Sequence, residues 1–207
     1  MTVIAIDGTF ASGKGTLGKR LADHYGLAYL DTGKLYRAVG YGVMQAGGDP
    51  ENAAHAAKAA KAITDKELDD PILKSGEVAV NASKVAVHPE VRKALFQFQR
   101  DFAAKGAVLD GRDIGTVICP DADVKFYVDA TAEIRAQRRH KELTGYGEDI
   151  TIETVLAQLI ERDNRDKNRE EAPLKAAHDA HLIETSTMRI DEVFETAVQI
   201  VDGVLGG

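Results

Sequence analysis

Five short apolar runs, each ending in a polar or glycine-containing break, set the pattern of the chain. Such runs are typical of strands buried on both faces. They cover residues 3–6, 27–30, 107–109, 124–128 and 182–184. A weaker run at residues 77–80 is a further candidate for a short strand.

Longer segments between these runs repeat their apolar residues every three or four positions, which predicts helices. These segments cover residues 14–25, 35–45, 51–63, 89–104, 151–168 and 190–205. Thr131 and Thr151 are expected to cap the helices that follow them. Strands that alternate with helices predict an α/β fold with a mostly parallel five-stranded sheet covered on both faces.

Polar clusters follow three of the predicted strands, after Asp7, at Asp31 and at residues 110–113. Parallel sheets of this kind bind ligands beyond the carboxyl ends of their strands. We therefore expect the functional site at that edge of the sheet.

The first cluster closely matches the phosphate-binding loop G-x-x-x-x-G-K-[ST], with Gly15 inserted before the hydroxyl residue. Its backbone amides and the following helix N-terminus would hold the phosphates of ATP. Lys14 would reach the β- and γ-phosphates as a catalytic cation, and Thr16 would bind Mg²⁺, the expected cofactor. The predicted ATP-binding residues are Gly8, Ala11, Ser12, Gly13, Lys14, Gly15 and Thr16.

A phosphate loop indicates a nucleoside triphosphate and leaves the reaction open. The guanine-reading N-K-x-D of a switch GTPase is missing, since the residues 164–166 read Asn-Arg-Asp. Many arginines suggest a second anionic substrate, which favours a kinase. Another small-molecule kinase of the P-loop type, or a nucleotide-dependent switch without a second substrate, remains an alternative.

The predicted helix at residues 151–169 carries charges on its apolar face. Arg162, Asp166 and Arg169 continue the stripe that Val155 and Leu159 begin, at steps of three and four. On periodicity alone, the simpler interpretation is that this end of the helix is solvated. Arg162 and Asp166 would then form a surface ion pair that stabilises the helix by a few tenths of a kcal/mol. The alternative is that this end faces a cleft that binds anions.

A second basic cluster, Arg135, Arg138 and Arg139, precedes the glycine-containing segment at residues 145–147. A mobile segment that carries arginines can close over a transferring phosphoryl group and exclude water. Arg138 or Arg139 is therefore the candidate for a catalytic cation from a closing segment.

Four separate motifs occur in the chain in one order: IDGTFASGKGT, LDTGKLYR, LDGRDIGTVICPDA and RDNRDKNREEAPL. Over almost its full length the sequence resembles the bacterial cytidylate kinases, which are P-loop nucleoside monophosphate kinases. The resemblance implies transfer of the γ-phosphoryl group of ATP to CMP or dCMP. It also implies one domain, residues 1–207, with a short monophosphate-binding insertion at 64–90 and a lid loop at 140–150.

The resemblance further implies which residues bind the monophosphate. Arginines suit this role because their forked donors match a phosphate dianion. Arg37, Arg112 and Arg169 would hold the phosphate with Thr32 nearby, and Arg162 and Asp166 would contact the ribose.

Ser83, Arg92 and Asp113 match the residues that read the base in these kinases. An aspartate can accept from the amino group of cytosine, while serine and arginine can donate to its acceptor edge. The simpler interpretation of Asp113 is a loop carboxylate that pairs with Arg112. The insertion is shorter than in longer members of the family, so Ser83 and Arg92 are placed through the stretch NASKVAVHPEVRKAL.

Composition restricts the remaining possibilities. The net charge of −7 argues against non-specific binding of nucleic acid. Cys119 is the single cysteine, so no intrachain disulfide can form, which suits a reducing cytoplasm. No signal peptide and no apolar run of about 20 residues is found. We expect a cytoplasmic monomer whose only partners are its small-molecule substrates.

Overall fold

The computed structural model describes residues 1–64 and 68–206. Its centre is a five-stranded sheet in the order β2-β3-β1-β4-β5, in which every neighbouring pair is parallel. The strands are β1 (Val3–Gly8), β2 (Ala28–Asp31), β3 (Ala107–Asp110), β4 (Val124–Asp129) and β5 (His181–Glu184). The predicted α/β fold class is confirmed.

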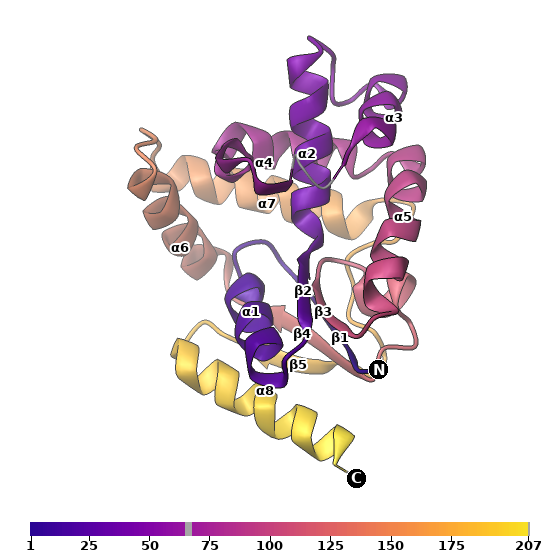
Figure 1. Cartoon of the computed structure of the whole chain (residues 1–207). Helices are drawn as coiled ribbons and strands as arrows, with labels where there is room; N and C mark the ends of the chain where they lie inside the picture. Colours follow the sequence, from indigo (N-terminus) through magenta and orange to yellow (C-terminus); the bar gives the residue numbers. More distant parts are fainter. Residues whose placement is uncertain (65–67, 207) are drawn as a thin grey trace.

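Helices cover both faces of the sheet (Figure 1). On one face, α1 (Lys14–Tyr25) and α8 (Ile190–Leu205) pack against Ile4, Ile6 and their neighbours. On the other, α5 (Pro89–Ala103) and the π-helical turn η3 (Ile114–Ile118) pack against Ala5 and Leu109. Because alternate residues of β1 enter different cores, its sequence is a continuous apolar run.

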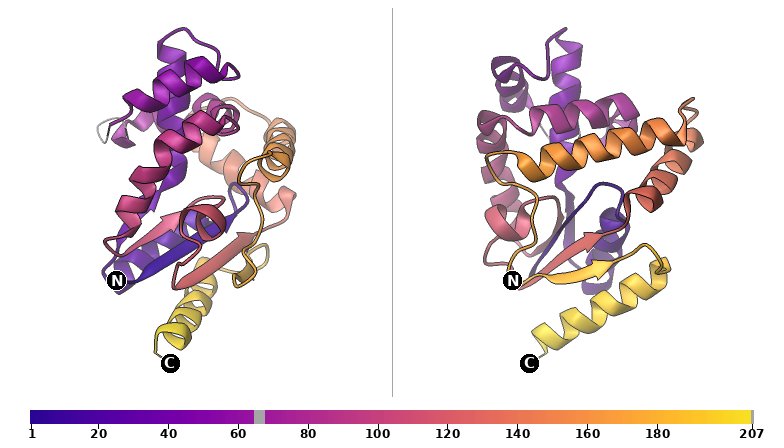
Figure 2. Two further views of the ribbon diagram at one scale, coloured as in Figure 1. Left: turned by 90° about the vertical axis from the view of Figure 1, so that its right-hand side faces the viewer. Right: turned by 180° about the vertical axis from the view of Figure 1, so that it is seen from behind.

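The other helices gather beyond the carboxyl ends of the strands, above the sheet in Figure 1 and in both views of Figure 2. They are α2 (Thr32–Gln45), α3 (Ala53–Ala62), the short 3₁₀-helix η2 (Pro71–Lys74), α4 (Gly76–Val85), α6 (Ala132–Gly145) and α7 (Ile152–Asn168). This group of helices faces the edge of the sheet where the sequence places the functional site.

The predicted strand at residues 77–80 is wrong, because these residues belong to α4. Ser75 caps this helix by accepting from the backbone N–H of Val78. The buried positions of α4 follow the helical spacing, and the alternation of Val78 and Val80 was a coincidence. Helix α2 passes so close that a Cβ on Gly40 would lie 3.0 Å from the Ala82 nitrogen.

The capping predictions are confirmed: Thr131 accepts from the N–H of Ile134, and Thr151 from that of Thr154. Helix α6 extends to Gly145, so the first part of the segment predicted as a lid loop, residues 140–145, is helical. Part of the predicted insertion, residues 65–67, lies outside the described residues. Among the described residues, none of the helices has the length and apolar character that crossing a membrane requires.

Candidate active site

The loop between β1 and α1 has the backbone that phosphate binding requires. Gly8 has φ +143°, and a Cβ there would lie 1.9 Å from the Val128 carbonyl oxygen, so no other residue fits. Gly13 (φ +99°) and Ala11 (φ +62°) also take positive φ values and turn the chain into α1. The predicted sequence of strand, glycine-rich loop and helix is therefore present.

Side chains brace this loop from within. The Thr9 hydroxyl donates to Asp129 (2.5 Å), and the Ser12 hydroxyl donates to the Thr9 carbonyl oxygen (3.0 Å). Lys14 donates to the same carbonyl (2.7 Å) and lies 3.9 Å from the Asp110 carboxylate. Burial, and next the charge of Arg112, lower the pKa of Lys14, so an arriving polyphosphate would stabilise its charged form.

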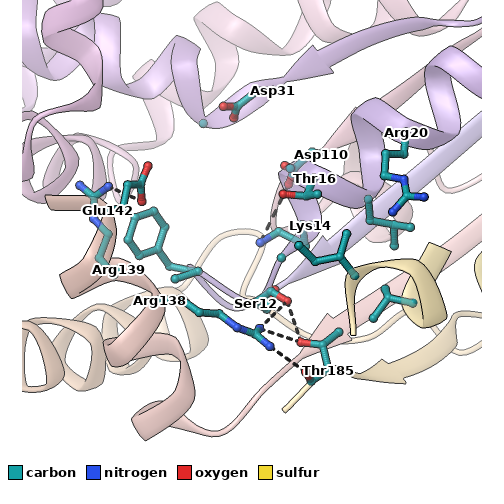
Figure 3. A pocket seen from close by; sticks show the side chains of 18 of the residues that line it. Ser12, Lys14, Thr16, Arg20, Asp31, Asp110, Arg138, Arg139, Glu142 and Thr185 are labelled. Atoms are coloured by element: carbon teal, nitrogen blue, oxygen red, sulfur yellow. Dashed lines mark hydrogen bonds and ion pairs between the residues drawn. The ribbon is translucent and has the colours of Figure 1, made fainter. Parts of the chain in front are cut away.

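The phosphate loop forms one wall of a cavity of about 540 Å³ (Figure 3). Basic side chains outnumber acidic ones in its lining, which makes it suitable for polyanions. The basic ones are Lys14, Arg20, Arg37, Arg112, Arg138, Arg139 and Arg162, and the acidic ones are Asp31, Asp110 and Glu142. Leu17, Met188, Ile190 and Val193 give the cavity an apolar end.

The two arginines predicted for the closing segment are held differently. Arg138 donates to both oxygens of Thr185 (3.0 and 2.7 Å) and approaches the Ser12 carbonyl (3.4 Å), which Figure 3 shows beside the loop. Arg139 pairs with Glu142 (2.8 Å) and donates to the Lys74 carbonyl (3.3 Å). Arg138 is thus attached to the phosphate loop, whereas Arg139 reaches toward the predicted insertion.

Three of the arginines assigned to the monophosphate or its ribose line the same cavity: Arg37, Arg112 and Arg162. Arg37 pairs with Asp31 (2.9 Å) and donates to the Gly33 carbonyl (3.2 Å). These bonds fix Arg37 at the junction of β2 and α2.

Arg112 and Arg162 meet at Asp166, at 3.2 and 3.8 Å, and Arg169 lies 4.0 Å from the same carboxylate. Burial acts to raise the pKa of Asp166, but the three arginines outweigh it and hold the pKa below its usual range. Burial, with the neighbouring arginines, lowers the pKa of Arg162 to about 9. The charged end of α7 is therefore an internal ionic network, and the interpretation as a solvated face is wrong.

Two of the residues predicted to read the base, Asp113 and Arg92, form a second buried cluster with Arg169. Asp113 pairs with Arg92 and lies 3.5 Å from Arg169. Its carboxylate makes these contacts and none with Arg112, so the alternative Arg112–Asp113 pair is not found. The Ser83 hydroxyl accepts from Arg165 (3.1 Å). Because Arg169 approaches both Asp113 and Asp166, the two clusters form one network.

Asp7 fixes the turn that presents this network. Its two carboxylate oxygens accept from the N–H groups of Ile114 (2.8 Å) and Gly115 (2.7 Å), directly after Asp113. Burial nevertheless raises the pKa of Asp7 to about 7. The carboxyl end of β1 thus determines the position of Asp113.

The sequence matches the family model described as Cytidylate kinase over residues 4–203. The chain belongs to the cytidylate kinase family. Relatives named cytidylate kinase agree with this match. That of Rhodopseudomonas palustris is 52% identical over 99% of this chain and 98% of its own length. That of Nitrobacter winogradskyi is 51% identical over 98% and 96%.

Solved structures support the fold alone. An uncharacterised protein from Eubacterium ventriosum has a TM-score of 0.57 at 14% identity, covering 98% of this chain and 99% of that one. TT1252 from Thermus thermophilus has a TM-score of 0.50 at 22% identity, covering 100% and 98%.

Not every residue that family resemblance singled out lines the cavity. Gly8 ends β1 below it, and Thr32 uses its hydroxyl to donate to the Asp110 carbonyl oxygen (2.8 Å). The others outside the lining are buried next to it: Ser83, Arg92, Asp113, Asp166 and Arg169. Of the three residues predicted to read the base, Asp113 and Arg92 are therefore paired with each other, and Ser83 is held by Arg165.

Sequence reasoning missed several residues at the site. Asp110 ends β3 beside the phosphate loop. Its carboxylate is so close to the loop that a Cβ added to Gly15 would lie 3.5 Å from it. Its place at the end of a predicted strand was a usable signal. Arg165 and Phe10 gave no comparable signal, because their contacts depend on how α4, α6 and α7 pack.

Proposed function

We propose that this protein transfers the γ-phosphoryl group of ATP to CMP or dCMP, giving ADP and CDP or dCDP. The observation that carries the proposal is that one cavity holds both groups of residues. This cavity joins the phosphate loop to Arg37, Arg112 and Arg162, in a chain of the cytidylate kinase family. A nucleotide switch has no need of a second group of arginines in the same cavity.

The cavity suggests how ATP is held. The amides of residues 11–16 and Lys14 would bind the phosphates, and the apolar end near Met188 and Val193 would accommodate the adenine. Thr16 is exposed and lines the cavity, as does Asp110, so a hydroxyl and a carboxylate are available for Mg²⁺. When bound, Mg²⁺ would neutralise charge on the β- and γ-phosphates.

The monophosphate would lie opposite, with its phosphate between Arg37 and Arg112 and with Arg169 behind them. Its attacking oxygen is already ionised, so the reaction needs alignment and charge neutralisation rather than a general base. Arg162 and Asp166 would contact the ribose. Because Asp166 is already paired with arginines, its carboxylate stays charged and correctly oriented before the substrate arrives.

Cytosine would be read by Asp113, Arg92 and Ser83. Arg165 already donates to the Ser83 oxygen, which leaves the hydroxyl proton free for an acceptor on the base. Asp113 would accept from the amino group of cytosine. To do so it must share or release its pair with Arg92, so base binding would rearrange the buried cluster.

The segment at residues 140–150 would act as the lid over this site. Glu148 accepts from the Gly76 N–H (2.8 Å) at the start of α4, and the Lys74 ammonium lies 5.9 Å from the Tyr146 ring. Contacts between the lid and the insertion at 64–90 would bring Arg138 and Arg139 over the phosphates. We place the activity in the cytoplasm, where both substrates are found, and expect a monomer.

A coupled assay for ADP tests the function. With ATP and Mg²⁺ fixed, CMP, dCMP, UMP, AMP and GMP are supplied in turn, and a reaction without any monophosphate serves as the control. We expect rapid ADP formation with CMP or dCMP, slower formation with UMP and little with the purines. ADP formation that is independent of the monophosphate, or fastest with a purine, would refute the proposal.

A further inference from the structure

Phe10 is a residue of the phosphate loop to which the ATP site gives no role. Its ring faces two arginines from different helices. The guanidinium carbon of Arg162 on α7 lies 4.1 Å from the ring centroid, and that of Arg139 on α6 lies 5.4 Å from it. Both distances are within the range in which a cation is attracted to an aromatic face.

Phe10 also attaches the loop to the pair of helices α6 and α7. Its side chain packs against the apolar cluster between them, which includes Leu143 and Leu159. Its carbonyl oxygen accepts from Arg135 of α6 (3.3 Å), and Arg135 forms a two-bonded pair with Asp163 of α7 (3.2 and 2.6 Å). One residue of the loop is thus fixed to both helices.

An aromatic ring suits this position better than an acidic or an aliphatic side chain. Arg139 and Arg162 share the cavity with Arg37 and Arg112, so like charges repel one another there. The Arg162 Nε is buried and makes no hydrogen bond within the described part of the chain. The ring face attracts a guanidinium without adding negative charge, which would weaken the binding of phosphates.

We infer that Phe10 is a positioning residue whose ring holds Arg139 and Arg162 toward the cavity. It so links the ATP-binding loop to one arginine of the closing segment, Arg139, and to one arginine of the monophosphate site, Arg162. The inference rests on the proposed function, because it assigns Arg162 to the second substrate and Arg139 to the transferring phosphoryl group. It adds that the two substrate sites are mechanically connected through one side chain.

The test compares three variants. Phe10→Leu keeps an apolar side chain but removes the ring face, and Phe10→Tyr keeps the face. Phe10, Arg139 and Arg162 also line a cavity of about 30 Å³, so the side chains around the ring leave some open space. Phe102→Leu is the matched control, since its ring packs in the apolar cluster on the other side of the sheet.

Calorimetry measures the binding of CMP to each variant, with and without a non-hydrolysable ATP analogue, below the melting temperature of all three. We expect Phe10→Leu to weaken CMP binding about tenfold, which corresponds to ~1.4 kcal/mol shared by two cation–π contacts. Phe10→Tyr and Phe102→Leu should remain within about threefold of wild type. In an Arg162→Met background, the loss caused by Phe10→Leu should fall to less than about threefold.

The outcomes separate the inference from the function. If wild type phosphorylates CMP and Phe10→Leu binds CMP as wild type does, the inference is wrong and the function stands. The same holds if Phe10→Tyr loses as much affinity as Phe10→Leu, because the ring face then does not matter. If wild type binds no CMP at all, both the function and the inference fail.

Discussion

Replacing Asp113 with asparagine should destabilise the fold as well as alter the reading of the base. Asp113 is the anion between two buried arginines, Arg92 and Arg169, and its side chain is 7% exposed. The substitution preserves its shape and removes its charge. Two guanidinium groups then share a buried site without their nearest anion.

The expected cost follows from this burial. Removing one partner of a buried ion pair costs about 3–5 kcal/mol, because the other charge stays desolvated. For a chain of this length, each kcal/mol lowers the melting temperature by about 2–4 °C, so a fall of about 6–20 °C is expected. Asp191 pairs with Arg20 at the surface, where its side chain is 74% exposed. Asp191→Asn should cost at most about 1 kcal/mol, which makes it the matched control.

Thermal melting without ligands measures the loss of stability, and kcat/KM for CMP and UMP measures the change in base preference. The amide that replaces the carboxylate in Asp113→Asn can turn and donate to the uracil carbonyl, so the preference for CMP over UMP should narrow, mainly through lost activity with CMP. If Asp113→Asn melts within about 4 °C of wild type, as Asp191→Asn should, the buried pairs do not exist as described. If the variant is destabilised but keeps the wild-type CMP:UMP ratio, Asp113 supports the fold and does not read the base.

Three further predictions concern the loop, the turn and the lid. Lys14→Met should fold normally and lower kcat by at least about 100-fold, as the loss of one preorganised donor does; near-normal turnover would contradict its role. Burial raises the pKa of Asp7 to about 7, so its protonated form stabilises the folded state. This contribution to the free energy of unfolding is complete below pH 3.8, the pKa of Asp7 in the unfolded chain, and is lost as the pH rises through 7. Urea unfolding from pH 4 to 8 should show this decline in wild type and not in Asp7→Asn, and parallel profiles would refute it. Cleavage after Tyr146 by chymotrypsin should slow when CMP and an ATP analogue are both bound, and equal rates would count against a lid at this place.

Most of the secondary structure could be predicted because it depends on local periodicity. The segment at residues 190–205 coincides with α8, and the strands lie within a few residues of their predicted places. One exception, α4, has a weak signal because its buried face consists largely of alanines and valines. Small side chains pack closely against α2 there, and the main local signal for a helix is the capping residue Ser75.

The candidate site was only partly predictable, for a different reason. The types of side chain that bind phosphate are visible in a sequence, but their partners are not. Arg112 pairs with Asp166 across 54 positions, and Arg165 binds Ser83 across 82. These pairings depend on how α7 packs against α4 and against the turn after β3. The sequence suggested Arg112, its neighbour, as a partner for Asp113, whereas the structure pairs Asp113 with Arg92 of α5.

The same packing explains how an acidic chain can hold two polyanions. The net charge is −7, yet the basic side chains of the cavity face inward, and only three acidic ones join them there. A low-dielectric wall concentrates the field of such a cluster, so the local potential is positive although the whole chain is negative. Two carboxylates close by, Asp113 and Asp166, are each held between arginines, which keeps those guanidinium groups in place. Asp113 and Asp166 are not part of the cavity lining, whereas Arg112 and Arg162, which Asp166 holds, do line it, so the charge that faces the cavity there is positive.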